Sequence, residues 1–186
     1  MNLILAVTGA TGTHAAEQLM KKSPWPVSLV ASDWGKDVAR REGGDFTRLA
    51  ALAHKVYDDH DLAAAISSGS VPTVGMVILP CSTNTLAKVA HGVADTLITR
   101  AAHCHLKERR NLVLCVRESP WTLMDFNNAA TVTSAGGVVM PLSPPFYQLA
   151  GRDPKTVTMT ELLDLFADRV LSVLGQPAAS NWETVL

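Results

Sequence analysis

The sequence predicts an α/β protein in which two layers of helices cover a doubly wound, mostly parallel sheet. Short aliphatic runs recur along the chain, and segments with helical spacing separate them. Most of these runs are apolar on both faces, which is typical of strands inside a parallel sheet. Strands that alternate with helices form β-α-β units with right-handed crossovers. The expected architecture is therefore three-layered and Rossmann-like or flavodoxin-like.

Five aliphatic runs are expected to be strands. They are Leu3–Val7, Val27–Ala31, Val74–Leu79, Asn111–Val116 and the short Val138–Met140. Thr8-Gly9 bounds the first run, and Gly136-Gly137 precedes the last. The third run is the best candidate for the centre of the sheet, because it is long and apolar on both faces.

Helices are expected between these runs. The predicted helices are Thr13 to the residue before Pro24, Gly35–Glu42, Thr85–Ala90, Ala94–Leu106 and Thr160–Leu174. Proline disfavours a helical residue before it, and glycine commonly ends a helix, which sets several of these boundaries. The segment from 45 to 60 is ambiguous, since apolar residues have helical spacing there until Asp58-Asp59 breaks the pattern. Asp61 is expected to cap a short helix that extends through Ile66.

Length and composition narrow the class of protein. A chain of 186 residues suits one domain over 1–186, with 176–186 as a C-terminal tail. The net charge is −1 and no basic stripe is present, which disfavours nucleic-acid binding. Three widely spaced cysteines argue against a disulfide framework. We expect no signal peptide and no membrane span, and hence a cytoplasmic protein.

The loops that follow strands are the expected ligand site, because ligands of doubly wound sheets bind beyond the carboxyl ends of the strands. The first such loop is Thr8-Gly9-Ala10-Thr11-Gly12. A phosphate fits the N-terminus of the helix that follows, with Thr11 donating a hydroxyl. The spacing matches neither a G-x-G-x-x-G fingerprint nor a P-loop, so a plain tight turn is an equally good interpretation.

The second loop begins at Ser32, which suits either a ligand contact or a helix cap. Trp34 suits either stacking on a flat ring or, more commonly, packing in the core. The third loop runs from Pro80 to Thr85 and contains three hydroxyl side chains and an amide. Short donors of this kind suit the polar edge of a flavin or a nucleotide, whereas helix capping explains only one of the four.

The fourth loop places Arg117 and Glu118 after a buried strand. Arg117 suits a phosphate and Glu118 suits proton transfer, while a structural ion pair is the alternative. Arg100 and Lys107 are seven residues apart and share a helix face. The run from His103 to His105 is not expected to bind metal, because adjacent residues of a helix point in different directions.

Several of these segments together resemble the flavin prenyltransferases, the UbiX-like family. The family includes the small-subunit proteins of phenolic and hydroxyaryl acid decarboxylase operons. The resemblance covers almost the whole chain. It rests on TGATG at Thr8, SDW at Ser32, ISSGS at Ile66, PCSTNTLAKVAHG from Pro80, TRAAHCHLKERRNLVLCVRESP from Thr99 and PLSPPFY ending at Tyr147.

This resemblance implies a specific reaction. Enzymes of the family join a dimethylallyl group from dimethylallyl phosphate to N5 and C6 of reduced FMN, without a metal. The product, prenylated FMN, serves decarboxylases of the UbiD type. The resemblance also implies a homo-oligomer, a dodecamer with the flavin between subunits.

The site residues follow from the matched motifs. The resemblance implies that FMN contacts Gly9, Ala10, Thr11, Ser32, Ser82, Thr83, Thr85 and Arg117. It implies that the prenyl phosphate contacts Arg100, Lys107, Tyr147 and Arg169. It assigns acid–base roles to Glu42 and Glu118, counts Lys107 with the catalytic groups, and matches Trp182 to an aromatic residue of the tail that covers the site.

The chain departs from the family pattern at three places. Thr11 replaces the usual serine, the stretch Trp121–Asn128 lacks the family's His-Leu-Glu-Asn pattern, and the segment Gln148–Thr158 is longer than usual. A non-catalytic FMN carrier of the same fold is therefore the alternative. A flavin-dependent cysteine decarboxylase is a weaker one, because Pro80–Thr85 resembles the PASANT motif of those enzymes.

Overall fold

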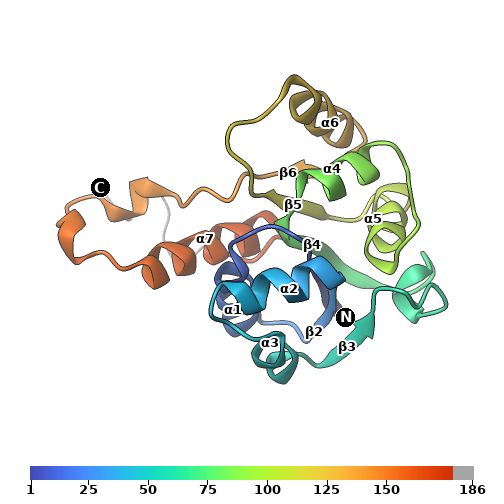
Figure 1. Ribbon diagram of the computed structural model, residues 1–186, viewed down its shortest axis with the longest axis horizontal. Helices are drawn as coiled ribbons and strands as arrows, with labels where there is room; N and C mark the ends of the chain where they lie inside the picture. The colour runs from blue at the N-terminus through green and yellow to red at the C-terminus, as the bar shows by residue number, and fades with distance from the viewer. Residues whose placement is uncertain (178–186) are drawn as a thin grey trace.

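A six-stranded parallel sheet lies between two layers of helices in the computed structural model, which describes residues 1–177 (Figure 1). The strands are β1 (Asn2–Val7), β2 (Val27–Ala31), β3 (Lys55–Asp58), β4 (Thr73–Cys81), β5 (Leu112–Val116) and β6 (Val138–Val139). Their order across the sheet is β3-β2-β1-β4-β5-β6, and every neighbouring pair is parallel. This is the doubly wound order, which reverses between β1 and β4. The predicted fold class is confirmed.

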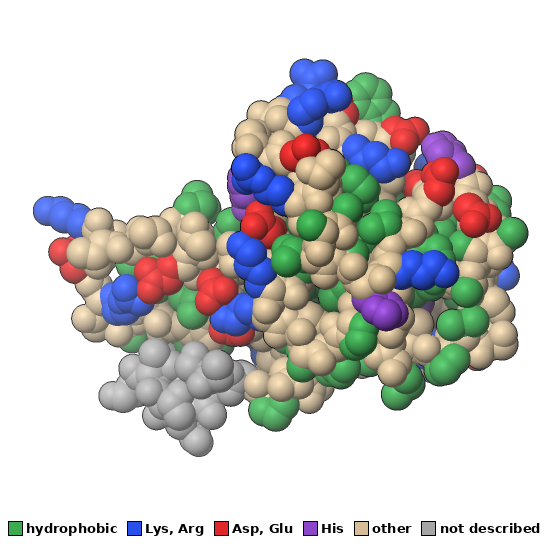
Figure 2. Space-filling model, turned by 90° about the horizontal axis from the view of Figure 1, so that it is seen from below, with side chains coloured by type: hydrophobic (Ala, Val, Ile, Leu, Met, Phe, Trp, Pro, Cys, Tyr) green, Lys and Arg blue, Asp and Glu red, His purple; other side chains and the backbone are tan. Residues whose placement is uncertain are grey.

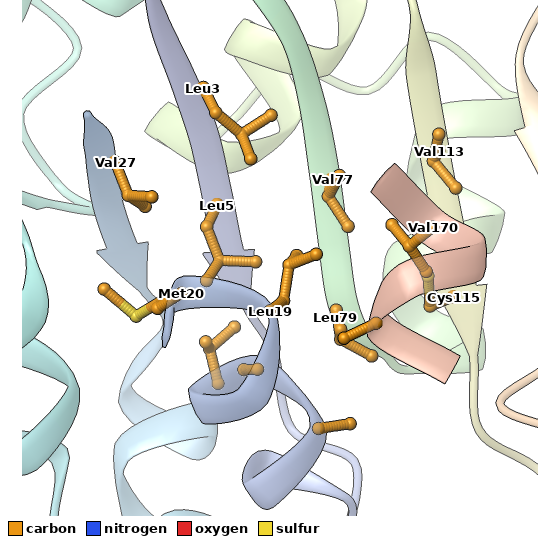
Figure 3. Close-up of a cluster of buried hydrophobic side chains, with 14 of the residues drawn as sticks. Leu3, Leu5, Leu19, Met20, Val27, Val77, Leu79, Val113, Cys115 and Val170 are labelled. Carbon is orange, nitrogen blue, oxygen red and sulfur yellow. The ribbon is translucent and has the colours of Figure 1, made fainter. Parts of the chain in front are cut away.

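One face of the sheet is covered by α1 (Thr13–Lys22), α3 (Phe46–Leu52) and α7 (Met159–Val173). Figure 3 shows Leu5, Val77 and Val113 on three strands, with Leu19 of α1 and Val170 of α7 lying over them. Aliphatic side chains from both layers are fully buried here, so burial of apolar area holds α1 and α7 on the sheet.

The other face is covered by α4 (Thr83–Ala90), α5 (Leu97–Lys107) and α6 (Leu123–Ser134). The remaining helix, α2 (Asp33–Arg41), follows β2 and contacts α3. Both faces of β1, β4 and β5 are thus buried, which explains why these strands read as continuous apolar runs. No helix within residues 1–177 has the length and apolar character needed to cross a membrane.

The structure differs from the sequence analysis at three places, of which only the helix expected at 61–66 was a wrong prediction. The ambiguous segment from 45 to 60 contains both α3 and the edge strand β3, whose residues are mostly exposed. Asp61–Ile66 is not a helix: the Asp61 carboxylate accepts a hydrogen bond from Ala63 N at 3.0 Å, and only the 3₁₀ turn η1 (Ala65–Ser67) follows. Helix α6 was not predicted at all.

Two further 3₁₀ turns, η2 (Phe146–Leu149) and η3 (Pro154–Thr156), lie in the segment between β6 and α7. This segment and the first turns of α7 project from the rest of the molecule (Figure 1). Figure 2 shows side chains of both charges on this projection, and both charged and hydrophobic side chains over the body. The longer 148–158 segment noted in the sequence therefore extends outward and does not fold over the sheet.

Candidate active site

A cavity of about 710 Å³ opens at the carboxyl ends of the strands, at the point where the strand order reverses. Its volume lies within the usual range of small-molecule sites, roughly 300–1,000 Å³. Its lining residues are Thr8, Gly9, Ala10, Thr11, Ser32, Asp33, Trp34, Asp59, His60, Ser82, Thr83, Asn84, Thr85, Lys88, Thr96, Ile98, Thr99, Arg117 and Glu118. The cavity thus gathers all four loops that the sequence singled out.

Thr8 joins the first loop to the third. Its side chain is 2% exposed, and its hydroxyl donates to Pro80 O at 3.0 Å and accepts from Ser82 N at 2.9 Å. Thr8 N also donates to Pro80 O, at 3.1 Å. Arg117 N in turn donates to Cys81 O at 3.0 Å, which ties the fourth loop to the third. One hydrogen-bond chain therefore fixes the three loops relative to one another.

The start of α2 packs directly on the first loop. Ser32 N donates to Val7 O at 3.0 Å, and the Ser32 hydroxyl caps α2 by accepting from Gly35 N at 3.0 Å. A Cβ at Gly35 would lie 2.5 Å from Val7 O, and one at Gly9 would lie 2.8 Å from the Cβ of Trp34. Both glycines are required for this close approach. The capping role of Ser32 is confirmed, and its hydroxyl hydrogen remains available to a ligand.

The third loop presents more polar groups than capping uses. Ser82 caps α4 by accepting from Thr85 N at 3.2 Å, and its Oγ lies 3.0 Å from Thr85 Oγ1. Thr83 and Asn84 line the cavity and make no side-chain hydrogen bond within the described residues. Cys81 is buried behind them, and burial raises the pKa of its thiol, so it acts as a small packed side chain, as expected.

The fourth loop leaves both of its charges facing the cavity. Arg117 and Glu118 are exposed and form no ion pair with each other. Glu118 Oε1 accepts from Ser119 N at 3.0 Å, while the Arg117 guanidinium has no protein partner within residues 1–177. The alternative of a structural ion pair is therefore wrong, and Arg117 is available to an anion.

Several lining residues were missed by the sequence analysis. Asp59 is 4% exposed, and its Oδ1 accepts from Ile98 N in the first turn of α5 at 2.9 Å. Burial raises the pKa of its carboxyl, and this hydrogen bond opposes the rise. His60 Nε2 lies 3.1 Å from Asp33 Oδ2 at the cavity. Asp33 raises the pKa of His60, and the imidazole lowers the pKa of Asp33. Lys88 pairs with Asp95 at 2.7 Å.

Glu42 does not line this cavity. Its carboxylate accepts from Gly12 N at 2.7 Å and from Thr13 N at 2.9 Å, behind the first loop. The Glu42 carboxylate therefore occupies two N–H groups at the start of α1. The sequence analysis had proposed a phosphate at this helix N-terminus, and for these two N–H groups that proposal was wrong. The acid–base role of Glu42 stays a prediction.

The residues predicted to bind the prenyl phosphate lie away from the cavity. Arg100 Nε donates to Ser67 O at 3.1 Å, and Lys107 pairs with Glu108 at the far end of α5. Tyr147 belongs to η2, and Arg169 lies on α7 with its Nη1 3.3 Å from Ser172 Oγ. Within one chain these four side chains do not converge on the cavity. Trp182 lies outside the described residues.

No three His, Cys, Asp or Glu side chains within residues 1–177 are grouped as metal ligands. His105 is instead buried, with Nδ1 2.8 Å from Ala101 O and Nε2 2.8 Å from Thr73 Oγ1. Burial lowers the pKa of His105, so this side chain connects α5 to the start of β4 as a neutral imidazole.

A doubly wound sheet with a hydroxyl-rich cavity at its switch point is the arrangement in which α/β proteins bind nucleotides and flavins. The family model described as Flavoprotein matches residues 1–171. The flavin prenyltransferase UbiX of Deinococcus radiodurans is 44% identical over 97% of this chain and 92% of its own. The chain therefore belongs to the flavoprotein family and, within it, to the UbiX-like flavin prenyltransferases.

Solved structures agree with this assignment. The chain is similar to AnUbiX (PadA1), crystallised with FMN and dimethylallyl pyrophosphate, with a TM-score of 0.89 and 34% identity over 97% of this chain and 96% of that one. It is also similar to a dodecameric FMN-dependent UbiX-like decarboxylase from Escherichia coli, with a TM-score of 0.88 and 34% identity over 97% and 98% of the two chains.

Proposed function

We propose that the chain, acting as a single domain, is a flavin prenyltransferase. It would transfer a dimethylallyl group from dimethylallyl phosphate to N5 and C6 of reduced FMN and supply the product to a UbiD-type decarboxylase. One observation carries the proposal: all eight residues that the family resemblance assigned to FMN line one cavity. The high identity to flavin prenyltransferases over nearly the full chain supports it.

The cavity fits FMN in size and in chemistry. Backbone groups at Gly9 and Ala10, together with the hydroxyls of Ser32 and Thr83, provide short donors and acceptors along its wall. Arg117 offers a guanidinium that no carboxylate of the described residues neutralises. These groups would bind and orient the flavin.

Prenyl transfer requires both anion stabilisation and proton movement. The allylic C–O bond breaks and phosphate leaves, while new bonds form to N5 and C6, each of which loses a proton; the prenyl double bond gains one. Glu118 is the carboxylate that lines the cavity beside Arg117, so we assign it the proton transfers. Cations must stabilise the departing phosphate.

We propose that neighbouring copies of the chain complete the phosphate site. Arg100, Lys107, Tyr147 and Arg169 lie on α5, on the projecting segment and on α7, all outside the cavity of their own chain. Tyr147 is carried by the projection, where Phe146 is 64% exposed. A homo-oligomer such as a dodecamer, as in the E. coli relative, would bring such residues to another chain's cavity.

The test is an anaerobic reaction of the purified protein with reduced FMN and dimethylallyl monophosphate, followed by mass spectrometry of the extracted flavin. We expect a flavin heavier by one prenyl unit. The reaction is repeated with the diphosphate as donor. Unmodified FMN with both donors, when absorbance shows FMN bound, would refute prenyl transfer and favour the carrier alternative.

A further inference from the structure

The aromatic side chain at the cavity is the feature that the proposed function leaves unexplained. Trp34 is the second residue of α2 and lines the cavity, yet its side chain is 70% exposed. The expectation that Trp34 packs in the core is therefore wrong. Because ligand sites are commonly lined by aromatic side chains, an indole exposed at the edge of this cavity is placed to contact a ligand.

The base of this side chain is held firmly. The Cβ of Trp34 packs so closely on Gly9 that a Cβ at Gly9 would lie 2.8 Å from it. The hydrogen bonds from Ser32 N to Val7 O and from Gly35 N to Ser32 Oγ fix the backbone on either side. The first loop and the first turn of α2 thus fix the backbone and Cβ of Trp34 at the edge of the cavity that its side chain lines.

The indole itself has no partner in the described part of the chain. Trp121, in contrast, donates from Nε1 to Glu118 O and packs 5.3 Å from the Phe126 ring, and Trp25 packs against the core beneath α1 and α7. No hydrogen bond, ring contact or cation–π contact involves Trp34 within residues 1–177. Its ring is therefore available to a ligand.

The composition of the cavity wall indicates which part of a ligand Trp34 contacts. Ligand sites are usually lined mainly by apolar and aromatic side chains with a few polar groups. Here Ala10, Trp34 and Ile98 are the apolar side chains among the lining residues, and Trp34 is much the largest. The hydroxyls and Arg117 serve polar edges and charges, so the flat apolar ring of a ligand has Trp34 as its main surface.

We infer that Trp34 is the aromatic wall of the site and stacks on the ring system of the bound flavin, because the first loop and α2 hold the indole at a cavity that otherwise lacks a large apolar face. The inference rests on the proposed function, since it takes FMN as the ligand. Indole and flavin rings attract each other in offset stacks, and this contact adds to the area buried. Trp34 therefore sets the affinity for the ring, independently of the phosphate contacts.

The experiment distinguishes a contact with the flavin ring from a contact with the ribityl phosphate. Oxidised FMN and lumiflavin, which lacks the ribityl phosphate, are titrated into wild-type protein and into Trp34→Ala and Trp34→Phe variants, and flavin fluorescence is recorded. Trp25→Phe is the matched control, because Trp25 lies before β2 at the opposite end of the sheet. Light scattering reports the oligomeric state of each variant.

We expect Trp34→Ala to weaken both ligands by a similar factor, roughly 5- to 150-fold by analogy with aromatic stacking on nucleobases. Trp34→Phe should retain most of the affinity, and Trp25→Phe should bind as the wild type does. Bound flavin should regain fluorescence in Trp34→Ala, because an indole in contact quenches it by electron transfer.

Three outcomes would overturn the inference. The first is unchanged affinity for both ligands in Trp34→Ala. The second is a loss confined to FMN, which would place Trp34 at the ribityl phosphate. The third is a changed oligomeric state with unchanged lumiflavin binding, which would mean that another copy covers the indole. Failure of the wild-type protein to bind any flavin would instead refute the proposed function.

Discussion

Replacing Thr8 by valine tests how the site is held together. Valine keeps the shape of threonine but removes the hydroxyl that donates to Pro80 O and accepts from Ser82 N. Pro80 O keeps its bond from Thr8 N, whereas Ser82 N loses its acceptor. A buried unsatisfied donor costs about 1–3 kcal/mol, and because Ser82 N is partly buried we expect the free energy of unfolding to fall by about 2 kcal/mol.

For a chain of this size, 1 kcal/mol corresponds to a shift in Tm of roughly 2–4 °C. Thr8→Val should therefore lower Tm by about 4–8 °C at fixed protein concentration, measured by circular dichroism. It should also weaken FMN binding, because the first and third loops are no longer joined. Thr8→Ser is the control, since it keeps both hydrogen bonds and loses only a methyl group, and it should retain FMN affinity. A valine variant as stable as the wild type, with unchanged FMN binding, would refute the reasoning.

Three further predictions concern the charged groups. Glu118→Gln should bind FMN normally but slow prenyl transfer by about 100-fold or more, the usual contribution of acid–base catalysis; equal turnover would remove Glu118 from the mechanism. Arg169→Ala should raise KM for dimethylallyl phosphate with little change in FMN affinity; a weaker FMN complex would show that Arg169 serves the other ligand. Asp33 raises the pKa of His60, so their attraction stabilises the fold below the ordinary imidazole pKa of about 6.5 and is lost as pH rises through the raised value. Asp33→Asn should lower the pKa of His60 in an NMR titration, and an unchanged pKa would contradict the contact.

The buried strands were predictable because both of their faces are apolar. β1, β2, β4 and β5 read as aliphatic runs, since helices cover them on both sides. β3 has no such run, because it is an edge strand whose Lys55, Val56 and Asp58 are exposed. Helix α6 escaped prediction because it buries only Asp125 and Val132, so its sequence lacks an apolar stripe.

The site residues were predictable where the strand before them had been recognised. Ser32, Thr83 and Arg117 lie in loops that follow correctly predicted strands, and all three line the cavity as expected. Asp59 and His60 were missed because they follow β3, which had not been recognised as a strand. The orientation of Glu42 depends on how α2 meets α1, and no local pattern in the sequence records that contact.

The central position of β1 also determines the order in which the sheet can assemble during synthesis. β1 lies between β2, with Leu3 opposite Val27, and β4, with Asn2 opposite Thr73. At roughly 5–20 residues per second, the ribosome needs about 4–14 s to add the residues that separate Asn2 from its β4 partner. For that time one edge of an aliphatic strand has no partner, and an unpaired edge of this kind readily joins another chain. The β1–α1–β2 unit can bury one face of β1 against α1 during that time, but the edge that pairs with β4 stays open until β4 arrives.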